Sequence, residues 1–149
     1  MKDKVKILFI CHGNICRSPM AEFVMKDMVK KAKLEWKFEI ASAATSTEEL
    51  GNPIHRGTQA KLREVGIPFD RRSARQMTRR DYEYYDMLIG MDRYNIRNMQ
   101  RITGGDPDGK MRMLLHHDVA DPWYTGNFDE TYRDVSEGCR LLMEELAGE

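Results

Sequence analysis

The sequence predicts a small doubly wound α/β domain in which helices flank a sheet of four parallel strands. Three observations support this fold class. Short apolar runs rich in branched residues alternate with segments of helical apolar spacing, turn-forming residues separate the two kinds of segment, and no repeat or low-complexity stretch interrupts the 149 residues. We therefore expect one domain over residues 1–149, with its ligand site outside the carboxyl ends of the strands.

The first strand and the first helix have the clearest signals. Residues 5–10 (VKILFI) end in a continuous apolar run, which is typical of a strand buried on both faces of a parallel sheet. Ser18 suits the N-cap of a helix and Pro19 suits its first position. Apolar residues at helical spacing follow, so we expect a helix from about residue 18 to residue 34.

The same signals predict the remaining elements. In the middle of the chain, glycine and proline mark the loops, Gly66 suits a helix end, and Thr78 with Asp81 forms a weak capping box. Near the C-terminus, apolar residues recur at spacings of three and four, which indicates an amphipathic helix. The expected elements are a strand over 37–43, a loop over 45–53, a helix over 55–65, a short helix over 78–85, a strand over 87–91, a helix over 95–102, a turn over 103–109, a strand over 113–115 and a helix over 132–146.

Composition excludes several classes of protein. The chain is 41% hydrophobic and 32% charged, with a formal net charge of zero, so no overall charge favours nucleic-acid binding. No apolar run approaches the ~18 residues of a membrane span. Three cysteines without a secretion signal favour a reducing compartment, and we expect a cytoplasmic protein.

The most informative stretch is CHGNICRSP, residues 11–19, which directly follows the first strand. A tight loop that opens a helix presents backbone N–H groups and the positive end of the helix dipole to an anion. Gly13 and Asn14 tolerate the positive φ angles that such a loop needs. Arg17 is placed to grip two phosphate oxygens as a bidentate donor. The sequence therefore predicts a phosphate-binding loop after the first strand.

The cysteine at the start of this loop predicts chemistry as well as binding. Cys11 is expected on the floor of the loop, where the N–H groups and the helix dipole depress the pKa of a thiol. A thiolate beneath a phosphoryl group is a nucleophile for phosphoryl transfer. Because Arg17, the loop and the dipole balance the anion charge, we expect no metal or other cofactor.

The stretch CHGNICRSPMAE closely resembles the phosphate-binding loop of the low-molecular-weight protein tyrosine phosphatases. Further matches run in order along the whole chain: Ser42, Ala74-Arg75-Gln76, Met91-Asp92 and Asp121-Pro122-Trp123-Tyr124. The resemblance implies hydrolysis of phosphotyrosine in proteins and of small aryl phosphates through a phosphocysteine intermediate.

The resemblance also implies the roles of individual residues. Cys11 is the nucleophile, Arg17 binds phosphate and stabilises the transition state, and Asp121 is the general acid. A carboxylic acid at that place speeds departure of a phenolate and can then activate the water that hydrolyses the intermediate. The expected phosphate- and substrate-binding residues are His12, Gly13, Asn14, Ile15, Cys16, Ser18, Trp123 and Tyr124, and the expected loop supports are Ser42, Arg72 and Asp92.

Further expectations follow from the resemblance and from departures from it. Cys16 looks like the second loop cysteine that forms a protective disulfide with the nucleophile, although simple packing is the alternative. Arg72 stands where the family often has a histidine, and Glu48 and Glu49 stand where an aromatic residue often lines the pocket. We expect phosphotyrosine proteins as substrates, phosphate or vanadate as inhibitors, and a monomer.

Three alternative functions are open on this scaffold. An arsenate reductase relays oxidation through cysteines downstream of the loop, where this chain has only Cys139, on the apolar face of a helix. A protein arginine phosphatase resembles this family but carries a small threonine where Ile15 stands, and Ile15 leaves less room for a guanidinium. A non-catalytic phosphate-binding module would not need Cys11, Arg17 and Asp121 together.

Two other patterns have simpler interpretations. His116-His117-Asp118 suggests a metal site, but adjacent strand residues point to opposite faces. The arginine-rich stretch over residues 71–80 is most simply a solvated surface, although it would also attract acidic or phosphorylated substrates.

Overall fold

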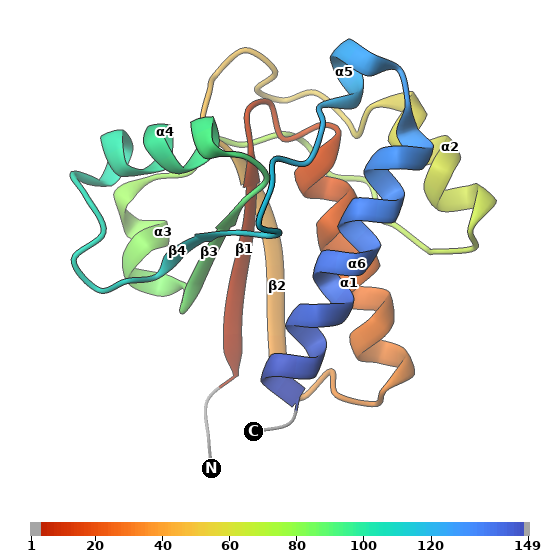
Figure 1. The fold of residues 1–149 in the computed structure, drawn as a ribbon, viewed down its shortest axis with the longest axis horizontal. Helices are drawn as coiled ribbons and strands as arrows, with labels where there is room; N and C mark the ends of the chain where they lie inside the picture. Colours follow the sequence, from red (N-terminus) through yellow and green to blue (C-terminus); the bar gives the residue numbers. More distant parts are fainter. Residues whose placement is uncertain (1–3, 148–149) are drawn as a thin grey trace.

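The computed structural model describes residues 4–147 and contains a four-stranded parallel sheet of strand order β2-β1-β3-β4. This confirms the predicted fold class. The strands are β1 (Val5–Cys11), β2 (Phe38–Ala44), β3 (Met87–Gly90) and β4 (Met111–Met113). Figure 1 shows β1 in the interior of the sheet, paired with β2 on one side and β3 on the other.

Helices cover both faces of the sheet. Helices α1, α2 and α6 lie on one side and α3 and α4 on the other, while α5 lies above the ends of the strands (Figure 1). Their bounds are α1 (Arg17–Lys31), α2 (Arg56–Glu64), α3 (Arg79–Tyr84), α4 (Arg93–Thr103), α5 (Pro122–Thr125) and α6 (Phe128–Ala147). None of the helices within residues 4–147 has the length and apolar character that crossing a membrane needs.

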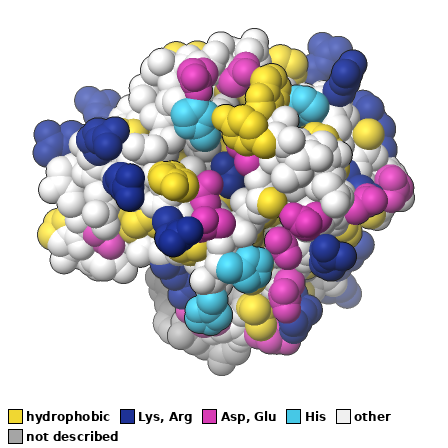
Figure 2. All heavy atoms as spheres, turned by 45° about the horizontal axis from the view of Figure 1, so that its top comes forward, with side chains coloured by type: hydrophobic (Ala, Val, Ile, Leu, Met, Phe, Trp, Pro, Cys, Tyr) yellow, Lys and Arg dark blue, Asp and Glu magenta, His cyan; other side chains and the backbone are white. Residues whose placement is uncertain are grey.

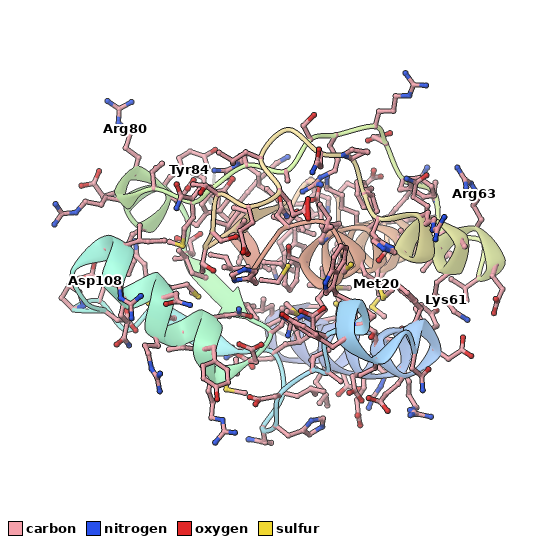
Figure 3. The ribbon with its side chains drawn as sticks, turned by 90° about the horizontal axis from the view of Figure 1, so that it is seen from above. Met20, Lys61, Arg63, Arg80, Tyr84 and Asp108 are labelled. Carbon is pink, nitrogen blue, oxygen red and sulfur yellow. The ribbon has the colours of Figure 1, made fainter. Side chains whose placement is uncertain are left out.

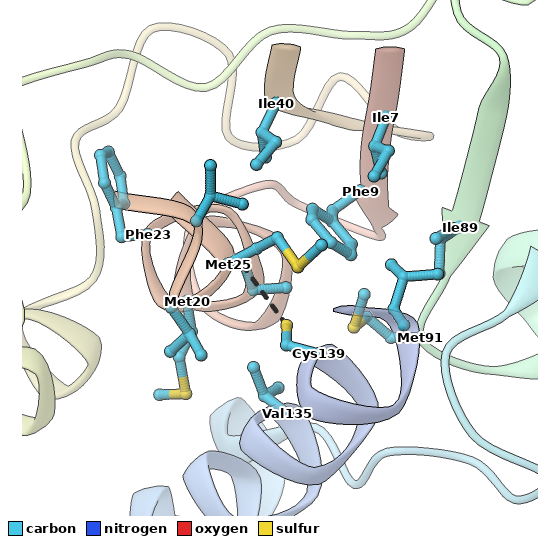
Figure 4. Close-up of a cluster of buried hydrophobic side chains, with 14 of the residues drawn as sticks. Ile7, Phe9, Met20, Phe23, Met25, Ile40, Ile89, Met91, Val135 and Cys139 are labelled. Atoms are coloured by element: carbon cyan, nitrogen blue, oxygen red, sulfur yellow. Dashed lines mark hydrogen bonds between the residues drawn. The ribbon is translucent and has the colours of Figure 1, made fainter. Parts of the chain in front are cut away.

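The core explains why β1 is apolar on both faces. Ile7 and Phe9 pack with side chains of α1 and α6, whereas Leu8 and Ile10 belong to a second cluster on the α3 and α4 side. Figure 4 shows Phe9 within the first cluster, which also contains Cys139 of α6. With both faces packed, β1 is held rigidly and the position of its last residue is fixed.

Several predicted boundaries were wrong. Helix α1 begins at Arg17 with Cys16 at its N-cap, so Ser18 lies inside the first turn and caps nothing; the helix also ends at Lys31 rather than near residue 34. Helix α4 starts at Arg93, two residues earlier than predicted, because the Asp92 side chain accepts a hydrogen bond from the backbone N–H of Asn95.

Strand β4 covers residues 111–113 rather than 113–115. The Asp106 carboxylate accepts a hydrogen bond from the backbone N–H of Met111 at 3.1 Å, which places Met111 beside Leu88 of β3. Leu114 follows the strand and packs against α6 close to Gly138. The apolar character of residues 114 and 115 therefore serves helix packing instead of the sheet.

Candidate active site

The loop between β1 and α1 folds around the sulfur of Cys11. The backbone N–H groups of Asn14 and Ser18 donate hydrogen bonds to Cys11 Sγ at 3.3 and 3.4 Å, and Ser18 Oγ lies 3.1 Å from the same sulfur. Asn14 has a φ angle of 60°, in the left-handed region that asparagine tolerates better than most residues. The loop thus directs its donors inward, toward a buried sulfur and the space above it.

The side chain of Asn14 connects the loop to three other segments. Its Nδ2 donates to Ser18 Oγ at 2.8 Å and to Ser42 Oγ, at the end of β2, at 3.0 Å. Since the Ser18 oxygen accepts from Asn14, its hydrogen is free to donate to Cys11. Arg72 donates from Nη1 to the Asn14 carbonyl oxygen at 2.8 Å and from Nη2 to Asn14 Oδ1. Ser42 and Arg72 therefore both hydrogen-bond to Asn14 of the loop, and their role as loop supports stays a prediction.

Sequence reasoning missed Glu22, a buried carboxylate behind this network. Ser42 Oγ donates to Glu22 Oε1 at 2.6 Å, and Lys26 Nζ donates to Glu22 Oε2 at 2.6 Å. Glu22 fixes the direction of the Ser42 hydroxyl, and this leaves the Ser42 oxygen to accept from Asn14. No local pattern of α1 distinguishes this glutamate, which is buried among mostly apolar residues of the helix.

Arg17 reaches from the first turn of α1 to the far side of the site. Its Nη1 donates to Asp92 Oδ2 and to the Val119 carbonyl oxygen, each at 2.8 Å, and its Nη2 lies 3.5 Å from Asp121 Oδ2. Burial opposes the charge of Arg17, but Cys11, Asp92 and Asp121 raise the pKa of the guanidinium. Arg17 is therefore a permanent cation held beside the sulfur.

Asp121 lies at the N-cap of α5, a short helix that the sequence did not predict. Its Oδ1 accepts from the backbone N–H of Trp123 at 3.0 Å while Oδ2 faces Arg17. Trp123 and Tyr124 follow on the surface, 58% and 83% exposed. The signal was present, since an aspartate before a proline suits an N-cap and the first helical position.

These groups surround one pocket of about 190 Å³ on the face that carries the loops. Figure 2 shows acidic, histidine and hydrophobic side chains close together on this face. Residues of the loop, of the segment after β2 and of the start of α5 line it: Cys11, His12, Gly13, Ile15, Cys16, Arg17, Glu48, Glu49, Asp121, Trp123 and Tyr124. Of the predicted binding residues, Asn14 and Ser18 lie behind the pocket wall.

All three cysteines are free and buried. Burial and the negative charges of Cys11 and Asp121 raise the pKa of Cys16 to about 12, so Cys16 is a thiol at neutral pH. Burial also raises the pKa of Cys139, whose Sγ donates to the Ala21 carbonyl oxygen at 3.7 Å (Figure 4). Cys139 is thus a core residue, and a disulfide between Cys11 and Cys16 stays a prediction.

His55 is a second residue whose importance the sequence did not reveal. Its backbone N–H donates to the Ile15 carbonyl oxygen at 2.8 Å, and its Nδ1 accepts from the backbone N–H of Gly57 at 3.0 Å. Its ring stacks on Phe128 and meets Trp123 edge to face, with centroid distances of 5.4 and 5.7 Å. His55 therefore ties the phosphate-binding loop to the segment that carries Asp121.

The structure does not support a metal site at His116-His117-Asp118. Among residues 4–147 no three His, Cys, Asp or Glu side chains are grouped as metal ligands. The Asp118 carboxylate instead accepts from Arg93, through its backbone N–H at 3.0 Å and its guanidinium at 3.4 Å. His117 Nδ1 lies 3.0 Å from the Asp118 carbonyl oxygen.

The arginine-rich stretch is divided among different tasks. Arg72 holds Asn14, and Arg75 pairs with Asp81 through two hydrogen bonds of 3.0 and 3.1 Å. Arg80 points outward from α3 at the periphery of the molecule (Figure 3). The stretch therefore does not form one basic surface around the pocket.

The fold and the loop around Cys11 define the class of α/β phosphatases that use a cysteine. Within this class, the chain belongs to the low molecular weight phosphotyrosine protein phosphatase family, whose sequence model matches residues 6–149. This confirms the resemblance found in the sequence.

Relatives of known name agree with this assignment. The low molecular weight protein-tyrosine-phosphatase YfkJ of Bacillus subtilis is 40% identical over 152 residues, which cover 97% of each chain. A low molecular weight phosphotyrosine protein phosphatase of Gallus gallus is 37% identical over 149 residues, covering 93% of each chain. The crystal structure of YfkJ matches 99% of this chain and 97% of its own with a TM-score of 0.95 at 38% identity.

Proposed function

We propose that this protein hydrolyses phosphotyrosine in proteins, and small aryl phosphates, through a phosphocysteine intermediate. The observation that carries the proposal is the position of Cys11 Sγ. This sulfur accepts hydrogen bonds from two loop N–H groups at 3.3 and 3.4 Å and lies in the pocket that Arg17 and Asp121 also line. Donors that point at a sulfur stabilise its thiolate, and a phosphate above it meets the remaining donors of the loop.

In the first step the Cys11 thiolate attacks phosphorus, the S–P bond forms and the P–O bond to the tyrosine ring breaks. Asp121 gives its proton to the departing phenolate oxygen. Arg17 and the loop N–H groups stabilise the charge of the transferring phosphoryl group. In the second step water attacks phosphorus, Asp121 takes a proton from that water, the S–P bond breaks, and inorganic phosphate leaves the regenerated thiolate.

The pocket favours an aryl substrate over the alternatives. Trp123 and Tyr124 offer a flat aromatic wall, while Ile15 occupies space that a guanidinium would need. Cys139, the only cysteine after the loop, is buried in the core, so it offers no partner for the thiol relay of an arsenate reductase. We further propose that phosphate and vanadate inhibit by occupying the loop, that the enzyme is a monomer, and that three free thiols suit the cytoplasm.

The test combines trapping with a nucleophile variant. Rapid quenching of wild type with an aryl phosphate should give a phosphoenzyme whose mass increase maps to Cys11. Cys11→Ser should keep less than about 1% of the wild-type rate while still binding vanadate, because the cradle is backbone and Arg17. A phosphorylated residue elsewhere, or an active Cys11→Ser, would refute the proposal. Comparison of phosphotyrosine, phosphoserine, phosphoarginine and arsenate separates it from the alternatives.

A further inference from the structure

One wall of the pocket is acidic, and this wall belongs to the segment that follows β2. Glu48 is exposed and Glu49 is half-buried, and both line the pocket that contains Cys11. The aromatic side chains of Trp123 and Tyr124 line the pocket as well. A substrate ring that reaches Cys11 must therefore carry its neighbouring residues past two carboxylates.

The acidic wall is fixed to the phosphate-binding loop by backbone hydrogen bonds. The N–H groups of Thr45 and Ser46 donate to the carbonyl oxygens of Cys11 and His12, each at 3.0 Å. Ser46 Oγ donates to the same His12 oxygen at 2.9 Å. The acidic segment therefore keeps a constant position relative to the loop that binds phosphate.

The two carboxylates are themselves held in place. Glu48 Oε2 pairs with Nε2 of the His12 ring across the pocket mouth. Glu49 Oε2 accepts from Asn52 Nδ2 at 2.5 Å, and its stem packs so closely on Gly13 that a Cβ there would lie 3.2 Å from Glu49 Cγ. Because Asn52 carries no charge, this hydrogen bond does not neutralise the Glu49 carboxylate.

No other lining residue neutralises this wall. The ionisable side chains that face the pocket are His12, Arg17, Glu48, Glu49 and Asp121, besides the two cysteines and Tyr124. Arg17 is buried and already faces two carboxylates, Asp92 and Asp121, and the proposed mechanism uses it to bind phosphate. His12 offsets Glu48 only in its protonated form. The mouth of the pocket is therefore negative although its floor binds an anion.

From this arrangement we propose that the Glu48 and Glu49 wall selects phosphotyrosine sites flanked by lysine or arginine and disfavours sites flanked by aspartate or glutamate. The inference rests on the proposed phosphotyrosine hydrolysis and adds the substrate class. For one unpaired carboxylate about 6 Å from the flanking charge in water, Coulomb's law gives about threefold attraction of a cation and threefold repulsion of an anion. Matched peptides should then differ about tenfold in kcat/KM.

The experiment compares phosphotyrosine peptides that differ only in having lysine, alanine or glutamate beside the phosphotyrosine. Wild type should show a lysine-to-glutamate kcat/KM ratio of about tenfold at low salt, falling toward one near 1 M salt, where the Debye length is about 3 Å. The double variant Glu48→Gln/Glu49→Gln should lower the low-salt ratio to within about twofold of one. Glu83→Gln is the matched control, because Glu83 is exposed on α3, away from the pocket, and it should keep the wild-type ratio.

A lysine-to-glutamate ratio near one for wild type, or a ratio that the double variant leaves unchanged, would overturn the inference while leaving phosphotyrosine hydrolysis intact. A correctly folded wild-type protein that hydrolyses none of the peptides would instead refute the proposed function. If the double variant does not fold, Glu49→Gln alone and the salt series on wild type give the same decision.

Discussion

Replacing Arg72 by alanine should disable the phosphate-binding loop although Arg72 lines no part of the pocket. In the structure Arg72 donates two hydrogen bonds to one residue, to the carbonyl oxygen of Asn14 at 2.8 Å and to its Oδ1. Asn14 needs such support because its φ angle of 60° has a cost even for asparagine, which tolerates the left-handed region better than most residues. Without Arg72, the loop loses the clamp that offsets this cost.

The magnitude follows from the two hydrogen bonds. Hydrogen bonds to a charged group contribute about 1.5–3 kcal/mol each, and water can replace part of this at a half-buried site. We therefore expect a loss of about 2–4 kcal/mol in loop order, which corresponds to a fall of about 30- to 1,000-fold in kcat/KM. Arg72→Lys keeps the charge but not the planar pair of donors, so its loss should be intermediate.

The assay measures kcat/KM with an aryl phosphate and the inhibition constant of inorganic phosphate. Both should worsen together, since the same loop N–H groups bind substrate and phosphate. The neighbouring Arg71→Ala is the control, because Arg71 is exposed, and it should behave as wild type. A folded Arg72→Ala variant with wild-type values of both constants would refute the clamp.

The remaining predictions concern chemistry and stability. Asp121→Ala should slow hydrolysis of phosphotyrosine-like esters about 10²–10⁴-fold and steepen the dependence of rate on leaving-group pKa; parallel dependences for variant and wild type would exclude a general acid. Arg17→Lys should be severely impaired in the same assay, since an ammonium lacks the planar fork, and a near-normal rate would contradict the site. Exhaustive chelation should leave full activity, and a loss restored by added metal would contradict metal-free catalysis. Burial opposes ionisation of Asp106, but hydrogen bonds from Tyr82 and from the backbone of Lys110, Met111 and Gly109 lower its pKa. Asp106→Asn should therefore be less stable to urea by about 1–3 kcal/mol at neutral pH, with the difference lost as pH falls below about 4; a pH-independent difference would refute this cause.

Most of the fold could be predicted from the sequence because most of its helices and strands have strong local patterns. The apolar run of β1 and the turn residues around α2 depend on neighbours in the chain, and the structure places both within about one residue of the prediction. The predicted position of strand β4 was wrong because the strand depends on Asp106 and on packing of Leu114 against α6. Such contacts between distant segments leave no periodic signal.

In the candidate site, too, residues close together in the chain could be predicted and contacts between distant segments could not. Cys11 and Arg17 were predictable because loop, spacing and helix start are contiguous in the chain. Ser18 was misjudged as a helix cap because a serine before a proline has that local meaning, whereas the fold uses its hydroxyl beside the Cys11 sulfur. Glu22 and the Val119 carbonyl oxygen were invisible, since a buried acid and a backbone oxygen acquire partners only after folding.

Asp92 shows how narrowly one position can be constrained. One carboxylate oxygen begins helix α4 by accepting from the N–H of Asn95 at 2.8 Å, and the other accepts from Arg17 at 2.8 Å. Asparagine would present an NH₂ group to one of these two donors, and glutamate would hold its oxygens one methylene too far away for the cap. A substitution of Asp92 would therefore weaken the start of α4 and the position of Arg17 at the same time. A viable relative that replaces Asp92 must then carry a second change that restores one of the two contacts.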